Sequence, residues 1–77
     1  MDYKVTFPNL NVTMIFKASY EVYCYLVTCV YGCDLDKVDE ETHIKAADAQ
    51  GWCELASAGD SYDGSDFSIE CVYSFNA

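Results

Sequence analysis

Five cysteines and a single histidine are the residues of this chain that could bind a transition metal. Zinc sites use both ligand types, and Cys29 and Cys33 have a spacing that such a site allows. A structural zinc site needs a second pair of ligands, however, and Cys53, Cys71 and His43 are each isolated in the sequence. We therefore expect free thiols, some of them buried, and neither a metal nor another cofactor.

The acids between Asp60 and Asp66 could instead bind calcium, which prefers oxygen ligands. They stand at the first, fourth and seventh positions of the segment. A calcium loop of the EF-hand type spaces its acids differently and ends on a glutamate, which this segment lacks. The pattern is more typical of an acidic turn.

Support for catalysis is equally weak. A cysteine nucleophile needs an activating base, and His43 is the only histidine of the chain. It stands in an acidic segment, where a solvated side chain is expected, and 77 residues leave little interior for a substrate pocket. We expect a protein that is not an enzyme.

The most strongly charged stretch runs from Asp34 to Glu41. It holds five of the thirteen carboxylates, which are Asp34, Asp36, Asp39, Glu40 and Glu41. The whole chain has a formal net charge of −9 and no arginine. It should therefore repel nucleic acid and attract basic surfaces. If the stretch is helical, it rises about 12 Å, a length over which duplex DNA carries about seven phosphates.

Other residues could enlarge this anionic surface. Asp60, Asp63 and Asp66 would extend it if their loop lies at the same end of the molecule. Tyrosine is enriched at binding hot spots, and Tyr31 lies three residues before Asp34, where the acidic stretch begins. The candidate partner-binding residues are Asp34, Asp36, Asp39, Glu40, Glu41, Asp60, Asp63, Asp66 and Tyr31.

Two alternating segments predict a hairpin at the start of the chain. Residues 2–7 alternate polar and apolar side chains, with Tyr3, Val5 and Phe7 on the inner face. Residues 8–11 contain proline and asparagine and predict a turn. Residues 12–18 form the second expected strand, with Val12 and Met14 among its inward side chains.

The next segment is rich in β-forming residues. Residues 20–31 contain four tyrosines and three valines, which favour a long central strand. A helix over residues 19–30 stays open, because Val22, Leu26 and Cys29 also match helical spacing. Gly32 ends either element.

A helix is expected over residues 34–51. Asp36 or Asp39 could cap its start, and Gly51 fits the left-handed position after its end. Ile44 and Ala47, with Val38, would form a thin buried stripe. Residues 52–57 predict a short strand, residues 58–65 a loop and residues 67–75 a final alternating strand.

Together these elements predict an α+β fold. We expect a single small domain, residues 1–77, with an antiparallel sheet of four to five strands and one α-helix packed on a face (β-β-β-α-β-β). The first residues lack the apolar region of a secretory signal, and no apolar run could span a bilayer. We therefore expect a cytoplasmic protein that is a monomer or weak dimer.

In its length, its single α+β domain, its negative charge and its lack of a catalytic motif, the chain resembles small phage-encoded inhibitors. It is similar in overall profile to acidic anti-CRISPR proteins of the DNA-mimic type. The resemblance implies that acids occupy the DNA-binding or PAM-reading groove of a CRISPR effector. Asp34, Asp36, Asp39, Glu40 and Glu41 would then stand in for phosphates.

The expected function is that of a non-enzymatic inhibitor. Its partner would be a basic host or defence protein, in particular a CRISPR effector subunit whose recognition of target DNA it blocks. Two alternatives stay open: an immunity protein or antitoxin that neutralises a basic nuclease, and a small metal-stabilised structural domain. Neither direct binding to nucleic acid nor binding to a membrane is expected.

Overall fold

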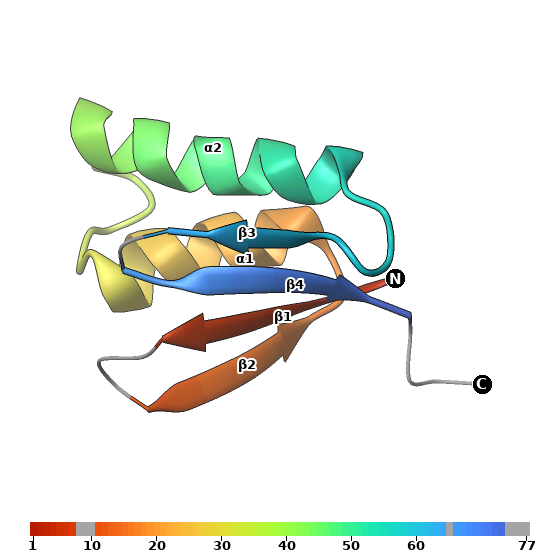
Figure 1. Cartoon of the computed structure of the whole chain (residues 1–77). Coiled ribbons are helices and arrows are strands. Elements are labelled where there is room, and N and C mark those ends of the chain that lie inside the picture. The colour runs from red at the N-terminus through yellow and green to blue at the C-terminus, as the bar shows by residue number, and fades with distance from the viewer. Residues whose placement is uncertain (8–10, 65, 74–77) are drawn as a thin grey trace.

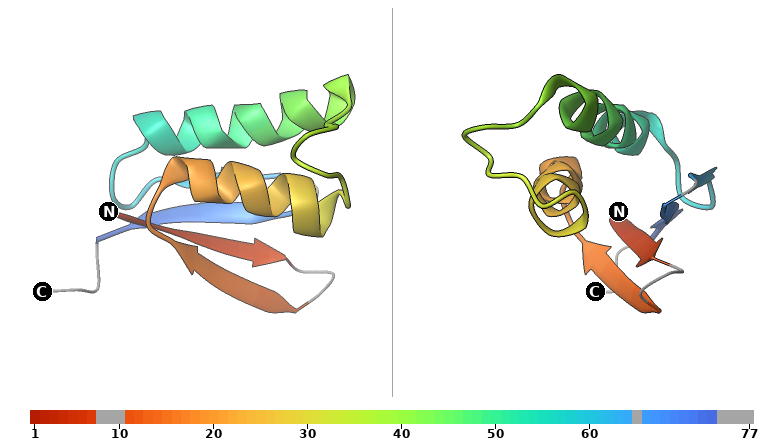
Figure 2. Two further views of the ribbon diagram at one scale, coloured as in Figure 1. Left: turned by 180° about the vertical axis from the view of Figure 1, so that it is seen from behind. Right: turned by 90° about the vertical axis from the view of Figure 1, so that its left-hand side faces the viewer.

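The computed structural model describes residues 1–7, 11–64 and 66–73. Its elements are β1 (Asp2–Phe7), β2 (Val12–Phe16), α1 (Ser19–Tyr25), the π-helical turn η1 (Leu26–Val30), α2 (Glu40–Leu55), β3 (Ser61–Asp63) and β4 (Ser68–Val72). The four strands form one antiparallel sheet in the order β2-β1-β4-β3. Both helices cover the same face of this sheet (Figures 1 and 2). The α+β class and the four-stranded antiparallel sheet are confirmed.

The predicted N-terminal hairpin is present. β1 pairs with β2 from Tyr3 opposite Phe16 to Phe7 opposite Val12. Val5 and Phe7 are buried, as the alternating pattern predicts. Val12, which was expected to point inward, is exposed on the edge strand β2. The expected turn at residues 8–11 falls largely outside the described residues. β2 ends at Phe16, two residues before the predicted end of the strand at residue 18.

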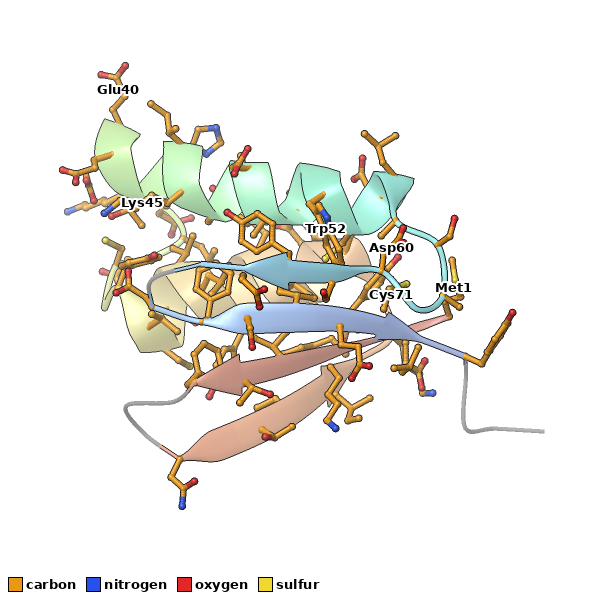
Figure 3. All side chains as sticks on the ribbon, in the orientation of Figure 1. Met1, Glu40, Lys45, Trp52, Asp60 and Cys71 are labelled. Atoms are coloured by element: carbon orange, nitrogen blue, oxygen red, sulfur yellow. The ribbon has the colours of Figure 1, made fainter. Side chains whose placement is uncertain are left out.

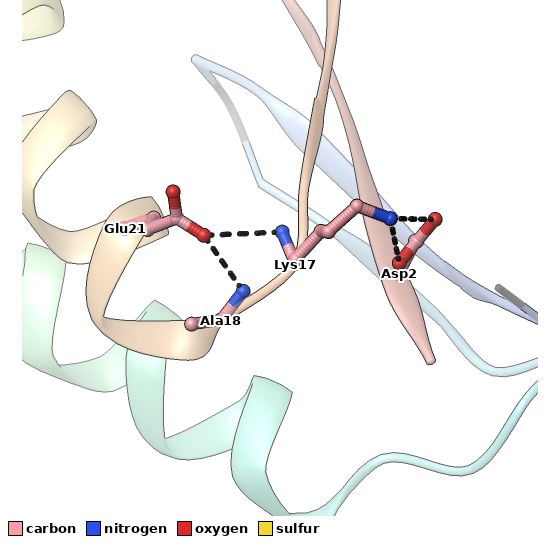
Figure 4. Close-up of polar contacts among 4 residues, drawn as sticks. All are labelled: Asp2, Lys17, Ala18 and Glu21. Carbon is pink, nitrogen blue, oxygen red and sulfur yellow. Dashed lines mark hydrogen bonds and ion pairs between the residues drawn. The ribbon is translucent and has the colours of Figure 1, made fainter. Parts of the chain in front are cut away.

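A polar corner explains why the second strand stops there (Figure 4). Lys17 extends its ammonium group to the buried carboxylate of Asp2, with N–O distances of 3.4 and 3.5 Å. The backbone N–H groups of Lys17 and Ala18 both donate to the Glu21 carboxylate, at 3.2 and 3.0 Å. This carboxylate occupies donors at the helix start that would otherwise be unsatisfied. The chain therefore turns from strand to helix within two residues.

The strand predicted over residues 20–31 is wrong, and the helical alternative over residues 19–30 is the one adopted. α1 and η1 bury Val22, Leu26 and Val27 completely against the sheet. Each such side chain contributes about 1.5–3 kcal/mol on burial. Strand and helix preferences of valine and tyrosine differ by only a fraction of ~1 kcal/mol per residue. Burial on the sheet therefore outweighs local preference.

The second helix is displaced along the sequence relative to its prediction. It begins at Glu40, because the Asp39 side chain accepts a hydrogen bond from the Thr42 N–H at 3.2 Å and caps it. It continues to Leu55, so the strand predicted over residues 52–57 is wrong. Its buried residues are Thr42, Ala46, Ala49 and Cys53. The expected stripe is also wrong, since Ile44 is 59% exposed.

The element order is consequently β-β-α-α-β-β, with two helices on the sheet where one was expected. The predicted loop over residues 58–65 contains the short edge strand β3. The predicted final strand is confirmed over β4, where Ile69 and Cys71 are buried as expected. Phe75 lies outside the described residues.

Two glycines provide a test of where η1 and α2 end. Gly32 is the second residue after η1 and has a φ of +67°. Gly51 lies inside α2 and not in the left-handed position predicted for it. A Cβ added at either position meets no atom within 4 Å. Gly32→Ala should therefore lower the free energy of unfolding by about 1 kcal/mol, whereas Gly51→Ala should raise it by about 0.5–1 kcal/mol. Urea denaturation measures both, and a loss of stability in Gly51→Ala would contradict the extent of α2.

Candidate functional site

The acidic stretch, residues 34–41, is mostly an irregular connection and not a helix. Only Glu40 and Glu41 are helical, and the Lys37 N–H closes a turn by donating to the Asp34 carbonyl at 3.0 Å. The expectation that the whole stretch is helical is therefore wrong. Asp39 caps the helix, so the helix begins at Glu40 and not at residue 34. Within the described residues, the exposed carboxylates of Asp34, Asp36 and Glu40 have no hydrogen bond or ion pair.

Asp39 differs from these three acids because the fold uses its carboxylate. The side chain and the backbone N–H of Thr42 each donate a hydrogen bond to Asp39, and the Cys33 thiol donates a third. Together these bonds hold the pKa of Asp39 below its usual value. The Cys33 Sγ lies 3.3 Å from Asp39 Oδ1. An acid with both oxygens engaged in this way has less capacity left for a partner. Asp39 is first of all a structural cap.

The acidic stretch is connected to the β3–β4 turn through a chain of side chains. Glu41 pairs with Lys45 at 3.3 Å, and the Lys45 ammonium lies 5.6 Å from the centre of the Tyr31 ring. The Tyr31 hydroxyl donates to Asp66 at 3.4 Å. The pKa of Lys45 is raised by its bond to Glu41, so the ammonium stays charged. The structure thus brings together Tyr31, Glu41 and Asp66, which come from three separate segments.

Asp60 lies away from this group. Figure 3 shows it at the end of α2 opposite to Glu40, near Met1. Its side chain accepts a hydrogen bond from the Ser57 N–H at 2.9 Å and so closes the loop after α2. Asp63, by contrast, is exposed at the end of β3 that leads into the turn. Asp60 therefore does not extend the anionic surface.

A partly open pocket of about 240 Å³ lies beside this group, between α2 and the β3–β4 turn. Residues that line it include Tyr31, Lys45, Asp48, Tyr62, Asp66 and Phe67. The Tyr62 hydroxyl donates to Asp48 at 3.2 Å, across the space between β3 and α2. The pKa of Tyr62 is raised mainly by burial and, to a smaller extent, by the hydrogen bond to the carboxylate of Asp48. The hydroxyl therefore remains a donor at neutral pH.

Of the pocket residues, only Tyr31 and Asp66 were among the predicted partner-binding residues. The α2 wall of the pocket includes Ile44, Lys45 and Asp48, and Asp48 follows the other two at helical spacing of four and three residues. This wall could therefore have been found from the sequence by placing the three residues on one helix face. The opposite wall, with Tyr62 and Phe67, has no such signal. Its position depends on how the C-terminal hairpin packs against α2.

Neither a metal centre nor a membrane span is found in the part of the chain that the structure describes. No three cysteine, histidine or acidic side chains there are placed to hold one ion. Neither α1 nor α2 combines the length and the hydropathy that crossing a bilayer requires. Comparisons with protein-family models, curated proteins and solved structures find no match to this chain.

Proposed function

We propose that this protein is a non-enzymatic inhibitor that docks its acidic surface on a basic, nucleic-acid-binding surface of a CRISPR effector complex. Its carboxylates would pair with lysines and arginines that otherwise hold DNA phosphates, and so block recognition of the target and its PAM. This activity would take place in the cytoplasm of the host cell. The observation that carries the proposal is the set of exposed acids Asp34, Asp36 and Glu40, which make no ion pair with any residue that the structure describes, in a chain with a net charge of −9.

The distribution of lysines supports the same proposal. Lys17 and Lys45 are engaged within the fold, by Asp2 and by Glu41. Lys4 lies on β1, so Lys37 is the one lysine within the acidic stretch and can offset one of the charges of Asp34, Asp36 and Glu40. A partner would meet a surface on which most of the negative charge is uncompensated. Charge-assisted hydrogen bonds to such acids are short and strong.

A direct binding assay tests the proposal. Guide-loaded CRISPR effector complexes are immobilised without DNA, and binding of the chain is measured at low and at high salt. We expect binding to weaken roughly tenfold or more between 50 and 300 mM salt, because exposed charges are increasingly screened. The bound chain should also prevent a labelled PAM-containing duplex from binding. Unchanged affinity across the salt range would contradict the DNA-mimic mechanism.

Matched variants separate the acidic stretch from overall charge. D36N/E40Q removes two unpaired acids of the stretch and should weaken binding roughly tenfold. E54Q/E70Q removes the same charge from exposed positions elsewhere and should weaken it less than about threefold. Equal effects of the two variants would contradict the assignment of the surface. Binding to a basic nuclease, with no binding to any effector, would favour an immunity protein or antitoxin instead.

A further inference from the structure

We propose that the pocket between α2 and the β3–β4 turn is an anchor site for one arginine side chain of the partner. The inference deepens the proposed function, and its role in a complex rests on that function. It gives the acidic surface a specific contact point: a guanidinium enters between Asp48 and Asp66 and stacks on the Tyr31 ring.

The size of the pocket suits a single side chain. Its volume is about 240 Å³, below the roughly 300–1,000 Å³ of sites that bind whole small molecules. Its rings are held in place by packing, since Tyr62 stacks on Phe67 with their centres 5.9 Å apart. Phe67 is buried and in turn contacts Phe7 of the core, with ring centres 6.4 Å apart. An entering side chain would therefore meet a preformed surface.

Two carboxylates face the pocket from opposite walls. Asp48 belongs to α2 and Asp66 to the β3–β4 turn, and each accepts a hydrogen bond from a tyrosine on another element. A carboxylate has about four acceptor positions, so one tyrosine bond leaves room for a guanidinium. The tyrosine bonds also orient the carboxylates. The site therefore offers two positioned anions beside aromatic faces.

Lys45 shows which kind of group the pocket accepts. Its ammonium already lies over the Tyr31 ring, 5.6 Å from the ring centre, while it pairs with Glu41. A cation over an aromatic face is attracted by the electrons of the ring. Lys45 is half-exposed and carries its charge on a long aliphatic stem, so an incoming cation can displace it from the ring while it keeps its pair with Glu41. Lys45 is thus an internal competitor for the site.

The chemistry favours arginine over lysine as the occupant. A guanidinium is planar, stacks on aromatic rings and forms paired hydrogen bonds with carboxylates, whereas an ammonium is a compact and strongly hydrated charge. The proposed partner surface, which normally binds phosphates, is rich in arginine for the same reason.

The test uses N-acetyl-arginine-N-methylamide as the probe, titrated into isotope-labelled protein and followed by amide chemical shifts. We expect saturable shifts around Tyr31, Tyr62 and Phe67, with a dissociation constant on the order of millimolar. The corresponding lysine compound should bind at least roughly threefold more weakly. Absence of saturable shifts, or equal binding of the two compounds, would overturn the assignment.

Two pairs of variants locate the probe. D48N/D66N should weaken its binding at least roughly fivefold, and D34N/D36N, with the same change of charge, by less than about twofold. K45M should tighten binding roughly threefold by removing the competitor, whereas K37M, which alters an exposed lysine outside the pocket, should change it little. Equal effects within either pair would show nonspecific ion pairing and overturn the proposal.

The same variants distinguish failure of the anchor from failure of the proposed function. If an effector binds wild type and D48N/D66N equally but loses affinity for D36N/E40Q, the anchor role is overturned and the inhibitor function is supported. If the probe binds the pocket as expected but no effector binds the chain, the pocket assignment is supported and the proposed function fails.

Discussion

Replacing Leu26 by alanine should lower the free energy of unfolding by about 2–5 kcal/mol, the usual range for a leucine removed from a core. The Leu26 side chain of η1 is fully buried in the core cluster that also contains Val5 of the sheet and Ala46 of α2. A domain of 77 residues has a total stability of about 4–12 kcal/mol. The variant would therefore lose a large share of its stability. Urea denaturation followed by far-UV circular dichroism measures the change.

Leu55 provides a matched control for the same substitution. It ends α2 and is 88% exposed. Leu55→Ala removes the same atoms, yet it should change the free energy of unfolding by less than about 0.5 kcal/mol. The difference between the two variants isolates the contribution of burial from that of helix preference. Similar losses in both would contradict the packing of the first helical segment on the sheet.

Alkylation of Cys53 by iodoacetamide should be at least a thousandfold slower in the native protein than in the urea-denatured chain. Burial, reinforced by the nearby Cys71 and Glu54, raises the pKa of the Cys53 thiol from 9.0 to about 12. Only the thiolate is nucleophilic, so three pKa units leave about one thousandth of the reactive form near neutral pH. The side chain is also only 1% exposed, which limits access of the reagent.

The exposed Cys29 is the internal reference for this reaction. Peptide mapping by mass spectrometry after timed alkylation at pH 8 follows both thiols in one sample. Cys29 should react at similar rates in native and denatured protein, whereas Cys53 should become reactive only when α2 leaves the sheet. Comparable native rates for the two cysteines would contradict the burial of α2. Raising the pH toward 12 should increase the native rate of Cys53, because the thiolate fraction rises.

The acidic stretch, the N-terminal hairpin and the final strand were predictable because they depend on local patterns. The alternation of Tyr3, Val5 and Phe7 selects one face of a strand whatever packs on it. Asp36 and Asp39 were both recognisable as candidate caps because a carboxylate before a helical run satisfies free N–H groups of the first turn, and the structure uses Asp39. The net charge follows from composition alone.

The identity of residues 20–31 depended on tertiary structure. Their valines and tyrosines favour a strand, but only the sheet formed by the two terminal hairpins provides the surface on which Val22, Leu26 and Val27 are buried as a helix. The extension of α2 through Trp52 has a similar origin, since the Trp52 ring packs on Tyr62 of β3 with centres 5.7 Å apart. Contacts between distant segments therefore outweighed local preference.

The pocket is the clearest case of a feature that only the tertiary structure decided. Composition and spacing by themselves determine that the chain is strongly acidic, that it has strands at both ends and that it has a capped helix between them. They do not determine that Tyr31, Asp48 and Asp66 meet, because these residues are 17 and 18 positions apart and belong to three different elements. Their meeting requires the C-terminal hairpin to pair with β1 and α2 to lie over it. Long-range pairing of this kind carries no periodic signal in the sequence.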